Sequence, residues 1–290
     1  MQKLIEKAEV LIEALPYIQS FRGAVIVVKF GGSAMEERRL YESILADVTF
    51  MECVGMLPVV VHGGGKAISR AMTAHGLTAR FMNGLRVTDE AGIRVVEEVL
   101  KNKVNADIVA TLERQGAQAR RVDGEAVFEV EKHTAKNDAT GEILDWGYVG
   151  EIRKVDAEPI MACLREATIP VVTPLGRGQD GKLYNLNADD AAAAVAKAVK
   201  ARKLAFVSDV PGLLRDRTDE GSLLSTLRVR EVEELVRTGV IEGGMLPKIR
   251  SCVEALEAGV KKIHIVDGRL LHSLLLEIFT DKGVGTEIIE

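Results

Sequence analysis

The sequence of 290 residues predicts an α/β protein, a three-layer αβα sandwich with a mostly parallel central sheet and an additional N-terminal helix. Five short runs of apolar, mostly β-branched residues are typical of strands buried on both faces. Helical patterns separate these runs, and such alternation favours parallel strands joined by right-handed crossovers. Four of the runs lead directly into glycine-rich or acidic segments, which marks one edge of the sheet as the place for a ligand.

The elements follow one another in a regular order. The expected strands lie at residues 25–30, 58–62, 169–174, 204–210 and 261–266. The expected helices lie at residues 38–55, 66–76, 89–115, 156–167, 188–201, 229–239 and 247–259. Residues 117–153 differ, because their short alternating segments predict hairpins that cap one end of the sheet. The alanine-rich helix near residue 200 is expected to join two lobes.

Composition excludes several classes of protein. There are 38 Lys and Arg against 43 Asp and Glu, a net charge of −5, and aromatic residues make up 4%. This balance argues against nucleic-acid binding, which needs a basic surface or stacking rings. No apolar run approaches the roughly 18–20 residues of a membrane span. The three cysteines are far apart and form no disulfide framework, so the sequence favours a cytoplasmic protein.

Residues 1–23 predict a separate amphipathic helix. Glutamates interrupt its apolar residues, which excludes a secretory signal. The apolar stripe consists of Leu4, Ile5, Ala8, Leu11, Ile12 and Leu15. Pro16 is expected to interrupt the helix. Two interpretations stay open: the helix packs on its own subunit, or it joins subunits.

Two glycine motifs predict an anion cradle. Lys29 ends a buried strand and is followed by Gly31 and Gly32, so a cation lies beside accessible backbone amides. Residues 62–66 (HGGGK) contain three successive glycines, which suit a backbone nest around a phosphate or a carboxylate. This run does not match the P-loop pattern. A structural turn is the alternative for both motifs.

Three further motifs carry charged side chains. Arg86, in NGLRVTDE, can grip a carboxylate with two hydrogen bonds. Asn185 and Asp189, in NLNADD, open the alanine-rich helix, where the acid also suits the helix dipole. Lys248 follows Pro247 in a first helical turn, where a cation opposes the dipole unless it binds an anion. The GxGxxG segment at 176–181 leads into no helical pattern and is interpreted as a loop.

In this order the motifs resemble the amino acid kinase superfamily, and within it the N-acetyl-L-glutamate kinase family. The resemblance runs from residue 24 to the C-terminus and includes the following segments: KFGGS, VVHGGGKAIS, NGLRVTDE, GYVG, YNLNADDAA, SDVPGLL and GGMLPKI. NGLRVTDE is the most specific of them. Lys66, after the triple glycine, departs from many relatives, which affects the start of the helix rather than the activity.

The resemblance implies transfer of the ATP γ-phosphoryl group, with Mg²⁺, to the side-chain carboxylate of N-acetylglutamate in arginine biosynthesis. It implies that Lys29 and Lys248 flank the transferred group and that Asp189 orients them. The implied substrate-binding residues are Gly64, Gly65, Arg86 and Asn185. The implied nucleotide-binding residues are Gly31, Gly32, Ser208, Asp209 and Lys248. No protein ligand for a metal is expected. A carboxylate nucleophile is already ionised at neutral pH, so no general base is required.

The same resemblance implies a domain organisation. Residues 1–23 form an oligomerisation helix, residues 24–200 the amino-acid lobe with a dimer interface, and residues 201–290 the ATP lobe. The N-terminus resembles arginine-inhibited relatives, in which such helices link dimers into a hexameric trimer of dimers. By that likeness, inhibitory arginine binds near Tyr17, Lys203, Glu277 and Gly283.

Two alternatives stay open at this point. One is a different enzyme of the superfamily, either a kinase of the aminoadipate type or a carbamate kinase. The other is a catalytically silent amino-acid sensor on the same fold. The context of Arg86 favours free acetylglutamate over the first alternative. Retention of Lys29, Lys248 and Asp189 argues against the second, because a sensor transfers no phosphoryl group.

Overall fold

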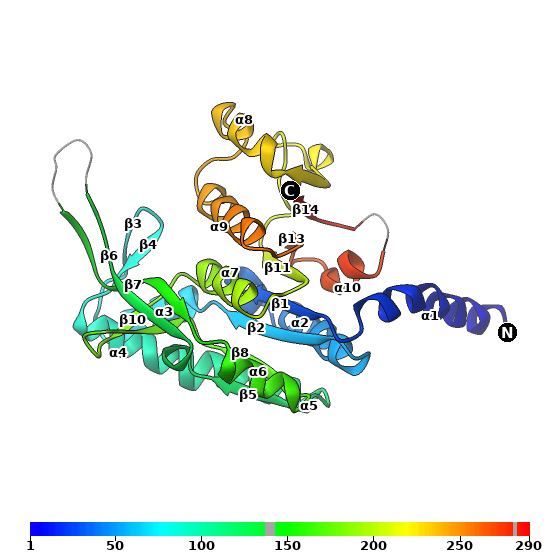
Figure 1. The fold of residues 1–290 in the computed structure, drawn as a ribbon, viewed down its shortest axis with the longest axis horizontal. Coiled ribbons are helices and arrows are strands. Elements are labelled where there is room, and N and C mark those ends of the chain that lie inside the picture. The colour runs from blue at the N-terminus through cyan, green and yellow to red at the C-terminus, as the bar shows by residue number, and fades with distance from the viewer. Residues whose placement is uncertain (137–142, 281–282) are drawn as a thin grey trace.

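A computed structural model describes residues 1–136, 143–280 and 283–290 and contains one large central sheet (Figure 1). Its eight strands follow the order β12-β14-β13-β11-β1-β2-β8-β5. Their bounds are β1 Val25–Phe30, β2 Leu57–His62, β5 Ala119–Val122, β8 Ile169–Val172, β11 Lys203–Ser208, β12 Thr226–Arg228, β13 Lys262–Asp267 and β14 Thr286–Ile289. The strands from β13 to β5 are parallel, and β14 is antiparallel to β13. The expected five strands and the α/β class are therefore confirmed.

Helices cover both faces of this sheet. One face packs against α6 (Glu158–Arg165), α7 (Ala188–Ala198) and α9 (Met245–Glu257). The other packs against α2 (Arg38–Cys53), α3 (Gly65–Ala74), α4 (Glu90–Glu98), α5 (Ala106–Arg114) and α10 (Ser273–Ile278). A short helix, α8 (Val232–Arg237), lies at the tip of the C-terminal part (Figure 1). The three-layer arrangement is thus confirmed.

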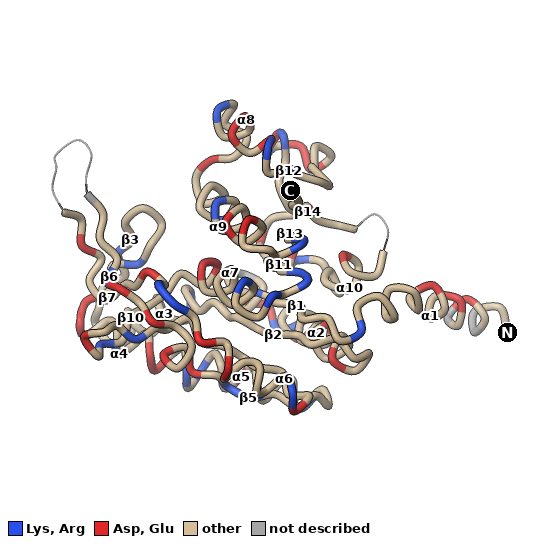
Figure 2. Tube along the Cα trace, viewed as in Figure 1, with Lys and Arg blue, Asp and Glu red and all other residues tan. Residues whose placement is uncertain are grey.

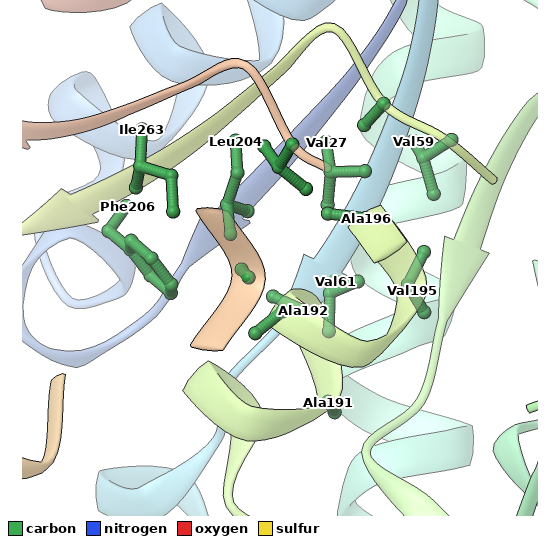
Figure 3. Packing of buried hydrophobic residues seen from close by; sticks show 14 of the residues in the cluster. Val27, Val59, Val61, Ala191, Ala192, Val195, Ala196, Leu204, Phe206 and Ile263 are labelled. Carbon is green, nitrogen blue, oxygen red and sulfur yellow. The ribbon is translucent and has the colours of Figure 1, made fainter. Parts of the chain in front are cut away.

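Strand alternation decides which side chains face which layer. Along β1, Val27 belongs to the core beneath α7 and α9, whereas Ile26 and Val28 belong to the core beneath α2. Figure 3 shows the first of these cores, where strand side chains meet the small residues of α7. Because successive side chains point to opposite faces, Lys29 lies on the same side as Val27 and faces α7 and α9.

The expected helix at 89–115 contains an irregular turn. The segment η2 (Val99–Asn105) is π-helical and lies between α4 and α5. Sequence periodicity did not predict this segment.

The hairpin prediction for residues 117–153 was partly wrong. The strands β6 (Phe128–Lys136) and β7 (Ile143–Val155) form the expected hairpin, and with β9 (Leu175–Gly178) and β10 (Leu183–Asn185) they close a small barrel. However, β5 joins the edge of the main sheet beside β8. A further hairpin, β3 (Arg80–Met82) with β4 (Leu85–Val87), lies next to the β6–β7 hairpin (Figure 1). The interpretation of the GxGxxG segment at 176–181 as a loop was partly wrong, because residues 176–178 belong to β9. The segment leads into the strand β10 rather than directly into a helix, as expected.

The N-terminal helix α1 (Gln2–Phe21) extends away from the rest of the chain (Figure 1). Between residues 5 and 15, its large apolar side chains are exposed: Ile5 44%, Val10 63%, Leu11 68%, Ile12 68% and Leu15 44%. The interpretation that it packs on its own subunit was therefore wrong for these residues. At the end of the helix, Phe21 is buried against the rest of the chain. The side chain of Leu4 lies outside the described part. The expected interruption at Pro16 was wrong: the helix continues through Pro16 to Phe21.

Within the described ranges, no helix combines the length and the apolar character that crossing a membrane requires.

Candidate active site

A cavity of about 630 Å³ lies at the carboxyl ends of β1 and β2, the edge at which the sequence predicted a ligand. The expected residues that line it are Lys29, Gly31, Gly32, Gly64, Gly65, Arg86, Asn185 and Asp189. They come from two strand ends, the start of α3, the β3–β4 hairpin, β10 and the start of α7. The fold therefore brings together eight predicted residues from four segments that lie far apart in the sequence.

Asp189 joins two lysines at the cavity wall: Lys29, which lines the cavity, and Lys248, which does not belong to its described lining. Its Oδ1 lies 2.8 Å from Lys29 Nζ, and its Oδ2 accepts a 2.7 Å hydrogen bond from Lys248 Nζ. Lys248 Nζ also lies 4.9 Å from the centre of the Phe206 ring, a cation–π contact. Burial acts to raise the pKa of Asp189, but the two lysines outweigh it and lower the pKa to about 2. The carboxylate is therefore ionised at every physiological pH.

The start of α7 fixes the direction of Asp189. Asn187 is the N-cap, and its Oδ1 accepts hydrogen bonds from the backbone N–H of Asp189 at 2.7 Å and of Asp190 at 3.3 Å. Asp189 thus lies in the first turn of α7, under the end of β1. In the neighbouring β10, Asn185 lines the cavity.

The two glycine motifs pack against each other. A Cβ on Gly31 would lie 3.2 Å from Gly63 Cα, which is closer than ordinary side-chain contact. Gly64 is the N-cap of α3 and supplies no side chain to satisfy the first amides of the helix. Since Gly64, Gly65 and Lys66 line the cavity, this helix N-terminus offers unpaired N–H groups and a positive dipole end to an anion.

Arg86 is a buried cation at the cavity wall, with 6% of its surface exposed. It donates hydrogen bonds to Gly65 O at 2.8 Å and to Ser69 Oγ at 2.9 Å, and its guanidinium stacks over Phe81. Burial lowers the pKa of Arg86. Among the described residues no carboxylate forms an ion pair with it, so the site has an uncompensated charge for an acidic ligand.

The charge of the cavity wall is strongly positive. Lys29, Lys66, Arg70 and Arg86 line it, whereas Asp189 is the one acid among its described lining residues. Arg70 additionally pairs with Glu36, which lies outside the lining. The sequence analysis did not identify Arg70, because an arginine on a helix surface carries no distinguishing pattern. The arrangement suits a ligand with several negative charges.

Ser208 and Asp209 do not belong to the described lining of this cavity. Ser208 ends β11, the neighbour of β1, and its carbonyl accepts a hydrogen bond from Gly268 N at 2.7 Å. Both residues therefore lie at the same edge of the sheet as Lys29, on the C-terminal side. Their expected role toward a nucleotide remains a prediction.

A second cavity, of about 1060 Å³, lies where α1 meets the C-terminal part of the sheet. All four residues expected to bind arginine line it: Tyr17, Lys203, Glu277 and Gly283. Burial and the nearby Lys262 lower the pKa of Lys203 to about 8. Glu277 accepts hydrogen bonds from Val284 N at 2.7 Å and Gly285 N at 3.0 Å and lies 2.6 Å from His264 Nδ1.

Comparison with known proteins gives the family. The amino acid kinase family matches residues 24–267. The acetylglutamate kinase of Carboxydothermus hydrogenoformans is 50% identical over 290 residues, 99% of each chain, and that of Heliobacterium modesticaldum is 47% identical over 295 aligned positions, 100% of each.

The solved structure of N-acetylglutamate synthase from Neisseria gonorrhoeae, complexed with coenzyme A and N-acetyl-glutamate, is 30% identical, with a TM-score of 0.83. The match covers 98% of this chain and 63% of the synthase chain, so this chain spans less than two thirds of that protein.

The parallel sheet, the glycine cradle and the two lysines around one aspartate define a phosphotransferase of the amino acid kinase family, to which this chain belongs. Sequence identity over nearly the full length of both this chain and the acetylglutamate kinases narrows the family further. The chain is a member of the acetylglutamate kinase family.

Proposed function

We propose that this protein transfers the γ-phosphoryl group of ATP to the side-chain carboxylate of N-acetyl-L-glutamate, in arginine biosynthesis. The observation that carries the proposal is the approach of Lys29 and Lys248 to one carboxylate beside a cationic cavity. The names of the full-length relatives support the choice of acetylglutamate and the enzymatic class.

The reaction matches what the site offers. A carboxylate oxygen of the substrate attacks the γ-phosphorus, the bond to the β,γ-bridging oxygen breaks, and an acyl phosphate and ADP result. No proton is transferred, so alignment and charge neutralisation are the main requirements. Lys29, Lys248 and the amides at Gly31, Gly32 and Gly64 would stabilise the migrating group, while Arg86 and Asn185 hold the acid.

Mg²⁺ would enter bound to the phosphates of ATP, where it neutralises charge between the β- and γ-phosphoryl groups. The described residues contain no group of three or more His, Cys, Asp or Glu side chains placed to hold a metal. Asp189, the acid at the cavity, is already engaged by two lysines. The donor set thus suits a nucleotide-borne ion. Residues 201–290, with Ser208 and Asp209, would bind the nucleotide, and residues 24–200 the amino acid.

The test is acyl-hydroxamate formation with MgATP and one acid at a time: acetylglutamate, glutamate, aminoadipate or carbamate. We expect turnover with acetylglutamate at least about a hundredfold above that with the other acids. The free ammonium group of glutamate would be repelled by the cationic lining, aminoadipate is one methylene longer, and carbamate lacks the second carboxylate. A preference for carbamate or aminoadipate would contradict the proposal and would indicate one of the other kinases of the superfamily. Nucleotide and arginine binding without turnover would indicate a sensor.

We propose further that arginine inhibits the enzyme from the second cavity and that α1 joins dimers into a hexamer. The convergence of Tyr17, Lys203, Glu277 and Gly283 supports an arginine site. A structure of the Neisseria gonorrhoeae synthase with coenzyme A and L-arginine, 30% identical and with a TM-score of 0.80, supports it too, and the match covers 97% of this chain and 65% of that one. The exposed apolar side chains of α1 support an intersubunit helix. Figure 2 shows that acidic positions also lie along this helix.

Deleting residues 1–20 tests both parts. We expect the truncated protein to form dimers, measured by light scattering, and to lose inhibition by arginine while it keeps its turnover. A truncated protein that stays hexameric and inhibitable would contradict the proposal. We also propose a cytoplasmic location, which the three free cysteines support.

A further inference from the structure

His62 and Asn105 form a buried polar pair beneath the glycine cradle. Both side chains are fully buried. Asn105 Nδ2 lies 3.1 Å from His62 Nε2 and donates a 2.9 Å hydrogen bond to Val171 O. On the other side of the ring, His62 Nδ1 lies 2.9 Å from Gly63 O. The pair therefore links the π-helical segment to the first peptide of the cradle.

These contacts fix the tautomer of His62. A carbonyl oxygen only accepts, so the Asn105 atom that faces Val171 O must be its NH₂ group. The same NH₂ group also faces His62 Nε2, which must then accept. Nδ1 therefore carries the proton and donates it to Gly63 O. A second proton on Nε2 would confront the NH₂ group, and burial lowers the pKa of His62 to about 4, so the ring is neutral at physiological pH.

The direction of one peptide follows. In a trans peptide the C=O and the next N–H point in opposite directions. His62 holds Gly63 O toward the interior, so the N–H of Gly64 points away from the ring, on the side where Gly63, Gly64 and Gly65 line the cavity. A peptide between two glycines has no side chain to prevent its rotation. The hydrogen bond between His62 and Gly63 O therefore helps to keep this amide in one orientation.

We propose that His62 and Asn105 are positioning residues, which hold the Gly63–Gly64 peptide with its N–H directed at the transferred phosphoryl group. The inference rests on the proposed phosphoryl transfer. It means that two buried side chains, rather than residues that line the cavity, help to align this donor.

The π-helical turn explains how Asn105 reaches this position. One extra residue in a helical turn rotates all following side chains by about 100° relative to an unbroken α-helix. The same turn supplies Leu100 and Val104, which pack against Gly64: a Cβ there would lie 2.6 Å from Leu100 Cδ2 and 3.7 Å from Val104 Cγ2. The segment therefore supports the cradle by packing and, through Asn105, by hydrogen bonding.

Three variants test the proposal. His62→Phe keeps a ring but removes the donor to Gly63 O. His62→Asn places an amide N–H near the position of Nδ1 and serves as the conservative rescue. Ile108→Val, a buried change on α5 that leaves the hydrogen-bonding groups of both residues in place, is the control for general destabilisation.

We expect His62→Phe to lower kcat at least about tenfold while KM for ATP stays within about twofold, since the donor acts on the migrating group. His62→Asn should recover most of the rate. Equal kcat for His62→Phe and Ile108→Val, each measured well below its unfolding temperature, would overturn the proposal.

Nitrogen NMR of the wild-type protein gives a readout independent of activity. We expect the signals of an Nδ1–H tautomer for His62, and an Nε2–H tautomer would overturn the inference while leaving the proposed reaction intact. Conversely, a wild-type protein that phosphorylates none of the acids would reject the proposed function, and with it the role of the peptide, although the tautomer would remain as described.

Discussion

Lys29 and Lys248 approach opposite oxygens of the same carboxylate, that of Asp189, at 2.8 and 2.7 Å. Lys29 is the penultimate residue of the strand β1, and Lys248 lies in the first turn of α9. Two ammonium groups that both contact one carboxylate repel each other. The negative charge of the shared Asp189 carboxylate offsets this repulsion.

Replacing either lysine by alanine should lower turnover strongly. Removing one preorganised donor to a transition state costs about 3–4 kcal/mol, so Lys29→Ala and Lys248→Ala should each reduce kcat at least about a hundredfold. Circular dichroism should show an intact fold. Lys154→Ala, at an exposed position on β7, is the matched control. A nearly normal rate for Lys248→Ala would exclude its assigned role.

The Asp189→Asn variant distinguishes a role in positioning the two lysines from a role in binding ATP. The variant leaves two nearly buried ammonium groups, with side chains 14% and 12% exposed, without their shared counter-charge. They should move apart, so kcat should fall at least about a hundredfold. Since the cavity becomes more positive, KM for ATP should not rise. Steady-state kinetics measure both constants, and an unchanged kcat would contradict the role of Asp189.

The Arg86→Lys variant should bind acetylglutamate poorly. A lysine keeps the charge but loses the planar fork that binds a carboxylate through two hydrogen bonds and stacks on Phe81. We expect KM for acetylglutamate to rise at least about tenfold, with KM for ATP unchanged. If both constants rose equally, Arg86 would be a structural residue rather than a substrate ligand.

Two neighbouring glycines should respond differently to alanine. At Gly64 the new Cβ would lie 2.6 Å from Leu100 Cδ2, whereas at Gly65 no other atom lies within 4 Å. Gly64→Ala should destabilise the protein by about 1–3 kcal/mol. Gly65→Ala, in the first turn of α3, should leave stability unchanged or raise it by up to about 1 kcal/mol. Denaturant unfolding measures both, and equal effects would contradict the packing described.

Stability should depend on pH through His62. The ring takes up a proton below about 6.5 in the unfolded chain but only below about 4 in the folded protein. Between these values the unfolded state binds more protons, so the free energy of unfolding should fall as the pH falls from about 6.5 to about 4. The contribution is at most about 3 kcal/mol. His62→Asn should lack it, and identical pH profiles for both proteins would disprove the low pKa.

The sequence was sufficient for the class of fold and for most of the cavity. Apolar, mostly β-branched runs such as residues 25–28 favour strands covered on both faces, and glycines after strand ends mark the edge where ligands bind. Lys29 and Asp189 were predictable because a strand end and a helix start fix the direction of their side chains. These are local constraints, and a single sequence carries them.

The tertiary structure decided the rest. The π-helical turn that brings Asn105 to His62 depends on packing against Gly64, which no local periodicity encodes. The exposure of α1 likewise depends on what its apolar stripe finds to pack against, and an amphipathic pattern is the same for either outcome. β5 pairs with β8 at the edge of the main sheet and does not belong to a hairpin that caps the sheet. The pairing of a strand depends on contacts with segments far away in the sequence, which its own residues do not specify. The sequence pattern of a segment determines which of its side chains become buried. Contacts between segments that lie far apart in the sequence determine which elements those side chains pack against.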